Sequence, residues 1–200
     1  MSNKILKVIF ALGLLMLSQI AQADTLALTG DYGLVPQYGG SYVGPINATL
    51  DGNAIPGGIV CTDEASISYF GSSFGVNIST LKDLSGTRFQ SAVKYEEAVW
   101  LIWQANANPT QVGPIQFAEW GLFNPGFADN LDAASRVWLT AAENMNPADY
   151  NFDSVRIYTP SAGFTSNQEF LSAGSSSVPI PSSALLLASG LVGLWYRRGR

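Results

Sequence analysis

Two side chains in this sequence, Cys61 and Gln116, are of the types that can form an internal thioester. Cys61 is the only cysteine of the chain, and Gln116 lies in the short stretch IQFAEW (residues 115–120). A cysteine sulfur beside a glutamine carboxamide can displace ammonia and leave an acyl donor that reacts with amines and hydroxyls. This chemistry requires that the elements carrying the two residues bring them together.

Little other chemistry is available to the chain. Histidine, the commonest general base, is absent from the sequence, which removes the usual catalytic triads and most zinc sites. Hydrolysis would depend on carboxylates alone, and Glu96, Glu97 and Glu119 form no evident glycosidase pair, because adjacent helix residues point in different directions. A carboxylate-dependent glycan-processing enzyme is therefore the weakest alternative. We expect no enzyme activity, no cofactor and no metal site.

The first 23 residues have the three parts of a secretory signal peptide. Lys4 and Lys7 supply the positive charge, residues 8–17 form a short apolar core, and Ala21-Gln22-Ala23 is a small-x-small cleavage site. The apolar run is too short to span a membrane comfortably. We expect export through the Sec pathway, with Asp24 as the mature N-terminus.

The last residues combine a proline motif, an apolar run and an arginine cluster. The motif is Val178-Pro179-Ile180-Pro181, the run covers residues 184–196, and Arg197, Arg198 and Arg200 follow. Counted from Pro179, the apolar stretch is just long enough to cross a bilayer, with the arginines on the cytoplasmic side. The C-terminal helix is therefore predicted to anchor the exported domain in the inner membrane. The simpler alternative to a sorting signal is a plain C-terminal membrane anchor.

This tail, VPIPSSALLLASGLVGLWYRRGR, resembles a PEP-CTERM sorting signal of Gram-negative bacteria that make extracellular polysaccharide. The resemblance implies that an exosortase in the inner membrane recognises the tail, cuts near the motif, and releases the protein to the cell surface or the extracellular matrix. Ile180 stands where the family has glutamate. The sequence therefore leaves cleavage at this motif open.

Between the two signals, residues 24–174 are long enough for one domain, and residues 175–200 form a Ser-rich spacer and the tail. Residues 24–177 contain all 15 acidic residues of the chain but only five basic ones, a net charge of −10. A surface this acidic repels phosphate backbones, so we expect no nucleic-acid partner.

The domain begins and ends with strand patterns. Runs rich in Tyr, Val, Ile and Thr occur at residues 41–50, 58–61 and 66–70, separated by glycine- and proline-containing turns. Asp51-Gly52 is typical of a two-residue hairpin turn. Strand patterns return at residues 154–158 and 168–171.

Three helices are predicted in between, at residues 93–104, 115–123 and 131–144. Pro109 and Pro114 are expected to bracket a loop, and Asp129 or Asn130 to cap the third helix. The stretch DNLD (residues 129–132) lacks the further ligands of a calcium loop. The pattern predicts an α+β fold: a β-sandwich or barrel-like β domain with an inserted group of short helices.

Two of these stretches resemble motifs of the thioester domains of bacterial surface adhesins. VCTDE (residues 60–64) is similar to the family's cysteine strand, with Asp63 after Cys61, and IQFAEW is similar to its TQxAIW helix. The late NQEF (residues 167–170) also resembles the end of a group of PEP-CTERM proteins. The resemblance implies a Cys61–Gln116 thioester that attaches the protein covalently to an amine- or hydroxyl-bearing target, a surface or an exopolysaccharide.

The neighbours of the pair suggest a wall and an assisting group. Phe117, Trp120 and also Trp100 are expected to shield a thioester from hydrolysis. Glu119 stands where the adhesin motif has an apolar residue, one turn from Gln116 on the same helix face. It is either a proton acceptor for the attacking nucleophile or a solvated charge. Because most helix carboxylates are exposed, we expect the solvated charge.

Simpler interpretations of both residues stay open. Cys61 would then be a free, buried thiol, and Gln116 a core residue that bonds main-chain groups. An intermolecular disulfide would need an exposed Cys61, whereas Ile59-Val60 before it indicate a buried strand. A structural or polysaccharide-associated matrix protein with the same fold and no thioester is therefore the main alternative function.

Overall fold

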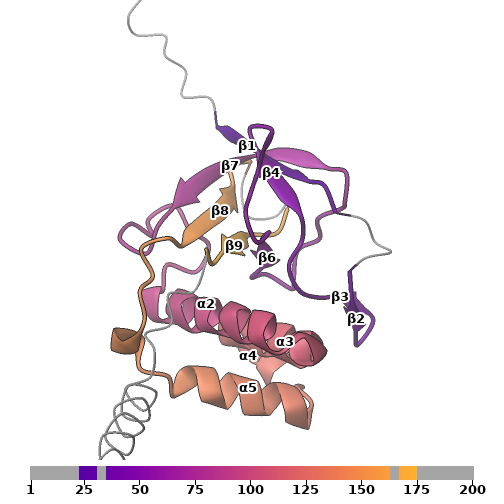
Figure 1. Cartoon of the computed structure of the whole chain (residues 1–200), viewed down its shortest axis with the longest axis vertical. Coiled ribbons are helices and arrows are strands. Elements are labelled where there is room, and N and C mark those ends of the chain that lie inside the picture. The colour runs from indigo at the N-terminus through magenta and orange to yellow at the C-terminus, as the bar shows by residue number, and fades with distance from the viewer. Residues whose placement is uncertain (1–22, 31–34, 163–166, 175–200) are drawn as a thin grey trace, which may run out of the picture.

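The computed structural model describes residues 23–30, 35–162 and 167–174. The predicted sorting tail, and the signal peptide apart from Ala23, lie outside these residues. The predicted α+β fold is confirmed: a strongly curled antiparallel sheet lies on a layer of short helices (Figure 1).

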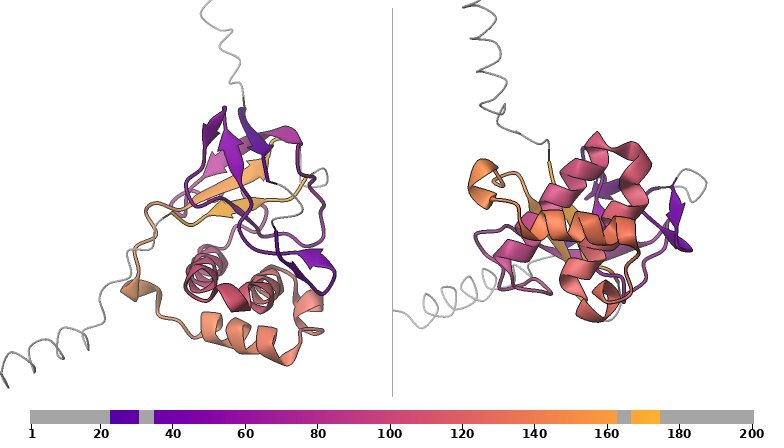
Figure 2. Two further views of the ribbon diagram at one scale, coloured as in Figure 1. Left: turned by 45° about the vertical axis from the view of Figure 1, so that its right-hand side comes forward. Right: turned by 90° about the horizontal axis from the view of Figure 1, so that it is seen from below.

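The sheet has seven strands in the order β5-β4-β1-β7-β8-β9-β6, and every neighbouring pair is antiparallel. Its strands are β1 (Asp24–Leu28), β4 (Ala48–Leu50), β5 (Asn53–Ala54), β6 (Val60–Cys61), β7 (Ser73–Ser79), β8 (Arg156–Pro160) and β9 (Phe170–Ser172). An isolated bridge between Ile46 and Ile59 joins the chain before β4 to the chain before β6. This bridge draws opposite sides of the sheet together, so the sheet curls into the half-barrel seen in Figure 2.

The hairpin turn at Asp51-Gly52 is confirmed. It joins β4 to β5, and both turn residues have positive φ, 48° and 81°. A two-residue hairpin of the type that follows the sheet's twist requires this conformation, which glycine adopts without strain.

The strand predicted at residues 66–70 is wrong. This segment has no strand partner, and Ile67 and Tyr69 are 64% and 63% exposed. Its apolar residues alternate as in a half-buried strand, but the next segment, β7, occupies the central position between β1 and β8. Alternation alone does not indicate which of two neighbouring runs finds a partner.

The helices form one insertion between β7 and β8, as predicted. They are α2 (Ala92–Ala107), α3 (Val112–Phe123), α4 (Pro125–Ala128) and α5 (Ala133–Glu143), with 3-10 turns η2 (Pro109–Gln111) and η3 (Pro147–Asp149). Figure 2 shows α2 and α3 side by side beneath the sheet, with α5 on their other side. The central helix, α3, is thus enclosed by the sheet, α2 and α5.

Two boundary details differ from the predictions. Pro114 lies inside the first turn of α3, where a missing N–H costs no helical hydrogen bond. Asp132, and not Asp129 or Asn130, caps α5 by accepting from the Ser135 N–H at 2.9 Å. The second oxygen of Asp132 accepts from the Tyr38 hydroxyl at 2.6 Å, which ties the small hairpin of β2 (Gln37–Tyr38) and β3 (Ser41–Tyr42) to α5.

Burial of α3 on all sides decides what its polar residues can do. Ten of its 12 residues are buried, including Gln116, Glu119 and Trp120. A helix that is apolar all round belongs in a protein interior. Trp120 packs in the apolar cluster formed by the curled sheet, and Cys61 belongs to that same cluster.

A buried carboxylate, Glu169, joins the sheet to the helical insertion. It is fully buried and accepts three hydrogen bonds: from the Arg88 N–H at 2.8 Å, the Thr159 hydroxyl at 2.6 Å and the Tyr95 hydroxyl at 2.5 Å. Burial, and then the charge of Glu169, raise the pKa of Tyr95. The residue after Glu169, Phe170, pairs with Cys61, so this network fixes the strand beside the cysteine.

Replacing Glu169 by Gln is expected to lower the free energy of unfolding by about 2–4 kcal/mol, because an amide nitrogen then faces one of the three donors in a buried site. Urea unfolding followed by circular dichroism measures the loss. Glu143→Gln, at an exposed position of α5, is the matched control and should change stability by no more than about 0.5 kcal/mol. Equal effects of the two substitutions would contradict the structural role of Glu169.

Candidate functional site

Strand β6 and helix α3 bring Cys61 and Gln116 together. The Gln116 side chain donates from Nε2 to the main-chain oxygen of Cys61 at 3.0 Å, across 55 residues of sequence. Both residues are buried, with exposed fractions of 6% and 3%, and the Cys61 thiol is free. The fold therefore brings the Gln116 side chain onto the main chain of Cys61, and a thioester between the two side chains stays a prediction.

A second donor from α3 reaches the same carbonyl. Trp120, one helical turn after Gln116, donates from its indole Nε1 to the main-chain oxygen of Cys61 at 3.0 Å. β6 is an edge strand and its only ladder partner among the described strands is β9. Two side chains of the helix thus satisfy the main-chain carbonyl of Cys61 at the edge of the sheet.

Glu119 is buried, and the prediction of a solvated charge is wrong. Its exposed fraction is 1%, and its Oε2 accepts from Gln116 Nε2 at 2.7 Å. Its other oxygen, Oε1, is buried without a hydrogen-bond partner among the described residues. The prediction failed because it assumed that α3 has an exposed face. The sequence signal was that Glu119 is the only charged residue in VGPIQFAEWGLF.

Burial raises the pKa of both the Glu119 carboxyl and the Cys61 thiol. Removal from water raises the pKa of Glu119 well above its usual value near 4.5, and the hydrogen bond from Gln116 offsets part of this shift. Burial also raises the pKa of the Cys61 thiol to about 12, followed by the nearby charge of Glu119, while hydrogen bonds from Trp120 and Gln168 lower it. The thiol is therefore protonated at neutral pH and lies within electrostatic reach of the carboxyl.

The sequence analysis missed Gly44. Its main-chain N–H donates to Gln116 Oε1 at 3.3 Å. Gly44 has a φ of +92°, and a Cβ atom there would lie 2.7 Å from Val112 Cγ1, so both conformation and space require glycine. No local sequence pattern links Gly44 to a residue 72 positions later.

Phe117 and Trp120 form the predicted aromatic wall, and Trp100 does not take part. Phe117 lies 5.2 Å from Trp120 and 4.9 Å from Tyr38, measured between ring centroids. Trp100 instead donates to the Tyr150 hydroxyl at 3.0 Å, in the cluster between the helices. The wall beside Cys61 therefore comes from α3 and the small hairpin.

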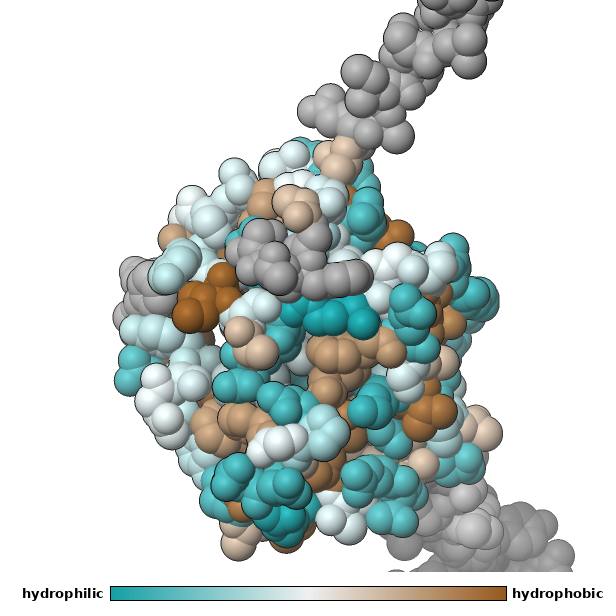
Figure 3. Space-filling model, turned by 180° about the vertical axis from the view of Figure 1, so that it is seen from behind, coloured by the Kyte–Doolittle hydropathy of each residue, from teal (hydrophilic) through white to brown (hydrophobic). Residues whose placement is uncertain are grey.

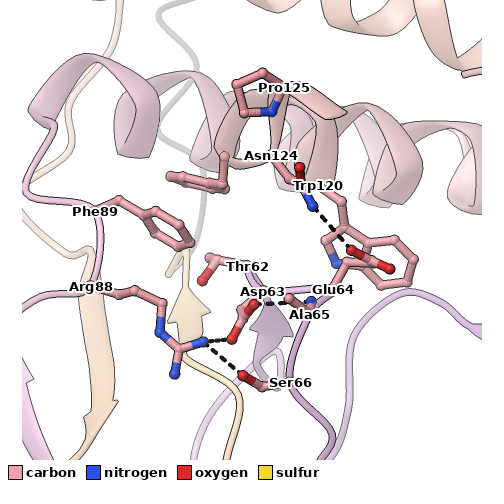
Figure 4. A pocket seen from close by; sticks show the side chains of 11 residues that line it. Thr62, Asp63, Glu64, Ala65, Ser66, Arg88, Phe89, Trp120, Asn124 and Pro125 are labelled. Atoms are coloured by element: carbon pink, nitrogen blue, oxygen red, sulfur yellow. Dashed lines mark hydrogen bonds and ion pairs between the residues drawn. The ribbon is translucent and has the colours of Figure 1, made fainter. Parts of the chain in front are cut away.

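Asp63 is buried but does not join the pair. Its carboxylate forms an ion pair with Arg88 and accepts from the Ala65 N–H at 3.1 Å. Arg88 also donates to the Ser66 hydroxyl and to the main-chain oxygen of Asn167, each at 3.0 Å. Asp63 thus clamps the loop after β6, and Figure 4 shows it turned toward Arg88.

A pocket of about 520 Å³ lies beside the site. The loop after β6 forms one side, Arg88 and Phe89 a second, and the end of α3 a third (Figure 4). Trp120 lines this pocket and at the same time bonds the Cys61 carbonyl. Its indole therefore stands between the pocket and the buried pair.

Two further pockets, of about 590 and 780 Å³, lie on the described surface, and neither is lined by Cys61, Gln116 or Glu119. The most exposed apolar side chains come from three segments: Ile67 and Tyr69 from the loop between β6 and β7, Val93 from α2 and Val137 from α5. Figure 3 shows small brown areas interspersed with hydrophilic ones on the face opposite that of Figure 1. Among the described residues there is no group of three or more His, Cys, Asp or Glu side chains suited to a metal ion. Within the same part of the chain, no helix has the length and apolar character needed to cross a membrane.

Comparisons of the chain with protein-family models, with curated proteins and with solved structures found no match. The geometry and the sequence motifs therefore carry the functional argument.

The Cys61 thiol should resist alkylation in the folded state of a Gln116→Ala variant, which cannot form a thioester. With a pKa of about 12, about one thiol in ten thousand is ionised at pH 8. We expect iodoacetamide labelling, followed by mass spectrometry, to be about a thousandfold slower than for the same variant in urea. Equal rates in the two conditions would show that the thiol is exposed.

The buried Glu119 predicts a pH dependence of stability. Because the folded state holds its proton more tightly, the unfolded chain binds fewer protons above pH 4.5, and stability falls as pH rises toward the folded-state pKa. We compare melting temperatures of Cys61→Ala with those of Cys61→Ala/Glu119→Gln from pH 4.5 to 8. The first variant should lose stability relative to the second across this range. A constant difference would mean that Glu119 titrates normally.

Proposed function

We propose that this protein is exported, sorted by an exosortase through its tail, and attached covalently to a target by a thioester between Cys61 and Gln116. One observation carries the proposal. The carboxamide of Gln116, in an enclosed site, donates a 3.0 Å hydrogen bond to the main-chain oxygen of the one cysteine of the chain. The function is adhesion at the cell surface or in the extracellular matrix, with the protein itself as acyl donor.

The chemistry of the site is acyl transfer in two steps. In the first, the Cys61 sulfur bonds to the side-chain carbonyl carbon of Gln116, and ammonia leaves with the thiol proton. In the second, an amine or hydroxyl bonds to that carbon, the C–S bond breaks, and the thiol regains a proton. Burial of both residues supports the proposal because it keeps water from the acyl carbon.

The tail and the signal peptide support the cellular part of the proposal. Sec-dependent export would bring the acidic domain to the outer face of the inner membrane, where the C-terminal helix holds it transiently. An exosortase-type enzyme is then the first partner, acting near Val178-Pro179-Ile180-Pro181. The second partner is an amine- or hydroxyl-bearing surface or exopolysaccharide, and it would approach through the pocket that Trp120 lines.

A structural or polysaccharide-associated matrix protein without a thioester is the second candidate. The observation in its favour is that both polar atoms of the Gln116 side chain are hydrogen-bonded: Oε1 to Gly44, and Nε2 to Cys61 and Glu119. A core glutamine that only fastens helix to sheet would make the same bonds. The covalent state of Gln116 separates the two candidates.

Mass spectrometry of the exported protein tests the thioester. The parent should be lighter than its sequence by one ammonia, and Cys61→Ala and Gln116→Ala should have their full masses. Methylamine should add to the parent and to neither variant. The missing mass is located by analysing the two peptides that contain Cys61 and Gln116. Processing at either end of the chain therefore does not affect the result. If the parent has its full mass and its thiol labels after unfolding, the thioester is refuted and the matrix-protein function remains.

A further inference from the structure

Among the described residues, the two most deeply buried carboxylates are Glu119 and Glu169, and their hydrogen bonding differs. Glu169 accepts three hydrogen bonds, as a structural carboxylate in a protein interior requires. Glu119 accepts one, from Gln116 Nε2, and its Oε1 has no partner among the described residues. A glutamine or a leucine would fill the same position in α3 without burying an incompletely bonded acid.

The position of Glu119 connects the two reacting groups. Its Oε2 is 2.7 Å from Gln116 Nε2, the nitrogen that departs as ammonia when a thioester forms. It is also close enough to Cys61 for its charge to raise the pKa of the thiol. One carboxyl group therefore touches the leaving nitrogen and lies within electrostatic reach of the thiol.

Thioester formation needs a proton carrier at this place. A thiol with a pKa of about 12 is a poor nucleophile until it loses its proton. The amide nitrogen is a poor leaving group until it gains one. Moving a single proton from sulfur to nitrogen meets both requirements. The chain has no histidine to do this.

We propose that Glu119 is the proton-transfer residue of this site, an inference that rests on the proposed thioester. The Glu119 carboxylate takes the proton of the Cys61 thiol as the sulfur bonds to the Gln116 carbonyl carbon. The resulting carboxylic acid gives that proton to Nε2 as the C–N bond breaks. Ammonia leaves, the C–S bond remains, and Glu119 returns to its carboxylate form.

Gly44 completes the arrangement. As the sulfur adds to the carbonyl carbon, negative charge develops on Gln116 Oε1. The Gly44 N–H already donates to that oxygen at 3.3 Å, and this hydrogen bond would strengthen as the negative charge develops. The Gln116 amide thus contacts the main-chain N–H of Gly44, the carboxyl of Glu119 and the main-chain oxygen of Cys61.

The same carboxyl serves the reverse direction. An amine that attacks the thioester must lose a proton, and the departing Cys61 sulfur must gain one. By microscopic reversibility Glu119 carries this proton too. Concentrated ammonia should therefore regenerate the Gln116 carboxamide and the free thiol, and removal of ammonia should let the thioester form again.

This reversal gives a rate to measure in the full exported protein. After ammonolysis and desalting, the loss of one ammonia is followed by mass spectrometry and by an enzymatic ammonia assay. Glu119→Gln should re-form the thioester about 10²–10⁴-fold more slowly than the parent, the usual contribution of a positioned acid–base group. Glu119→Asp should recover part of the rate. Glu143→Gln, on the surface of α5, should re-form it at the parental rate.

The pH profile separates proton transfer from a structural role. Among the described residues, Glu119 raises the pKa of one other titratable group, the Cys61 thiol on β6, so the rate is measured below pH 9, where that thiol stays protonated. The parental rate should rise with pH as Glu119 becomes a carboxylate and then level, and Glu119→Gln should show no such rise. If Glu119→Gln does not fold, the profile of the parent alone decides, and a flat parental profile overturns the inference.

The outcomes for the two proposals are distinct. A parent that never lacks ammonia refutes the thioester itself. A parent that forms the thioester, with Glu119→Gln forming it at an equal rate and with the same pH profile, refutes only the role of Glu119.

Discussion

The main-chain carbonyl of Cys61 is the point on which the rest of the structure depends. It lies on a two-residue strand at the edge of the sheet, inside the apolar core. A buried carbonyl without a partner costs about 1–3 kcal/mol, and no further strand covers this edge among the described residues. Gln116 and Trp120 of α3 supply the missing donors. The helix thus takes the place of a neighbouring strand. Because the Cys61 carbonyl requires a donor, the polar amide of Gln116 lies in the core.

The opposite side of β6 is fixed by the Glu169 network. Thr62, directly after Cys61, bonds the main-chain oxygen of Glu169 through both its N–H and its hydroxyl. The side chain of Glu169 binds α2 through Tyr95 and β8 through Thr159. The cysteine is therefore held between two polar contacts, one to each of the central helices.

The sequence allowed the coarse fold to be predicted, and its motifs singled out Cys61 and Gln116, because both kinds of inference depend on local signals. The spacing of apolar residues changes from a strand pattern to a helix pattern and back, which located the helices between strands. Asp51-Gly52 indicated a hairpin turn. The features that were predicted wrongly or missed depend on burial and on contacts between residues far apart in the sequence. Glu119 was predicted to be exposed because the sequence pattern of one helix does not show how many neighbouring elements pack around it. Gly44 had no local signal, since its partner lies 72 residues away. Residues 66–70 have a strand pattern, but pairing is decided by competition with β7.

Loss of ammonia would change the hydrogen bonding of the site unevenly. The Nε2 atom bonds both the Cys61 carbonyl and Glu119, so its departure leaves the carbonyl with Trp120 alone and removes the donor that Glu119 has. The thioester form is therefore less completely bonded than the amide form, in a site where each missing bond is costly. Attack by an amine creates a new amide whose N–H can occupy the position of Nε2. Attack by a hydroxyl creates an ester, which has no such donor. The contacts around Gln116 consequently match the amide product better than the ester product.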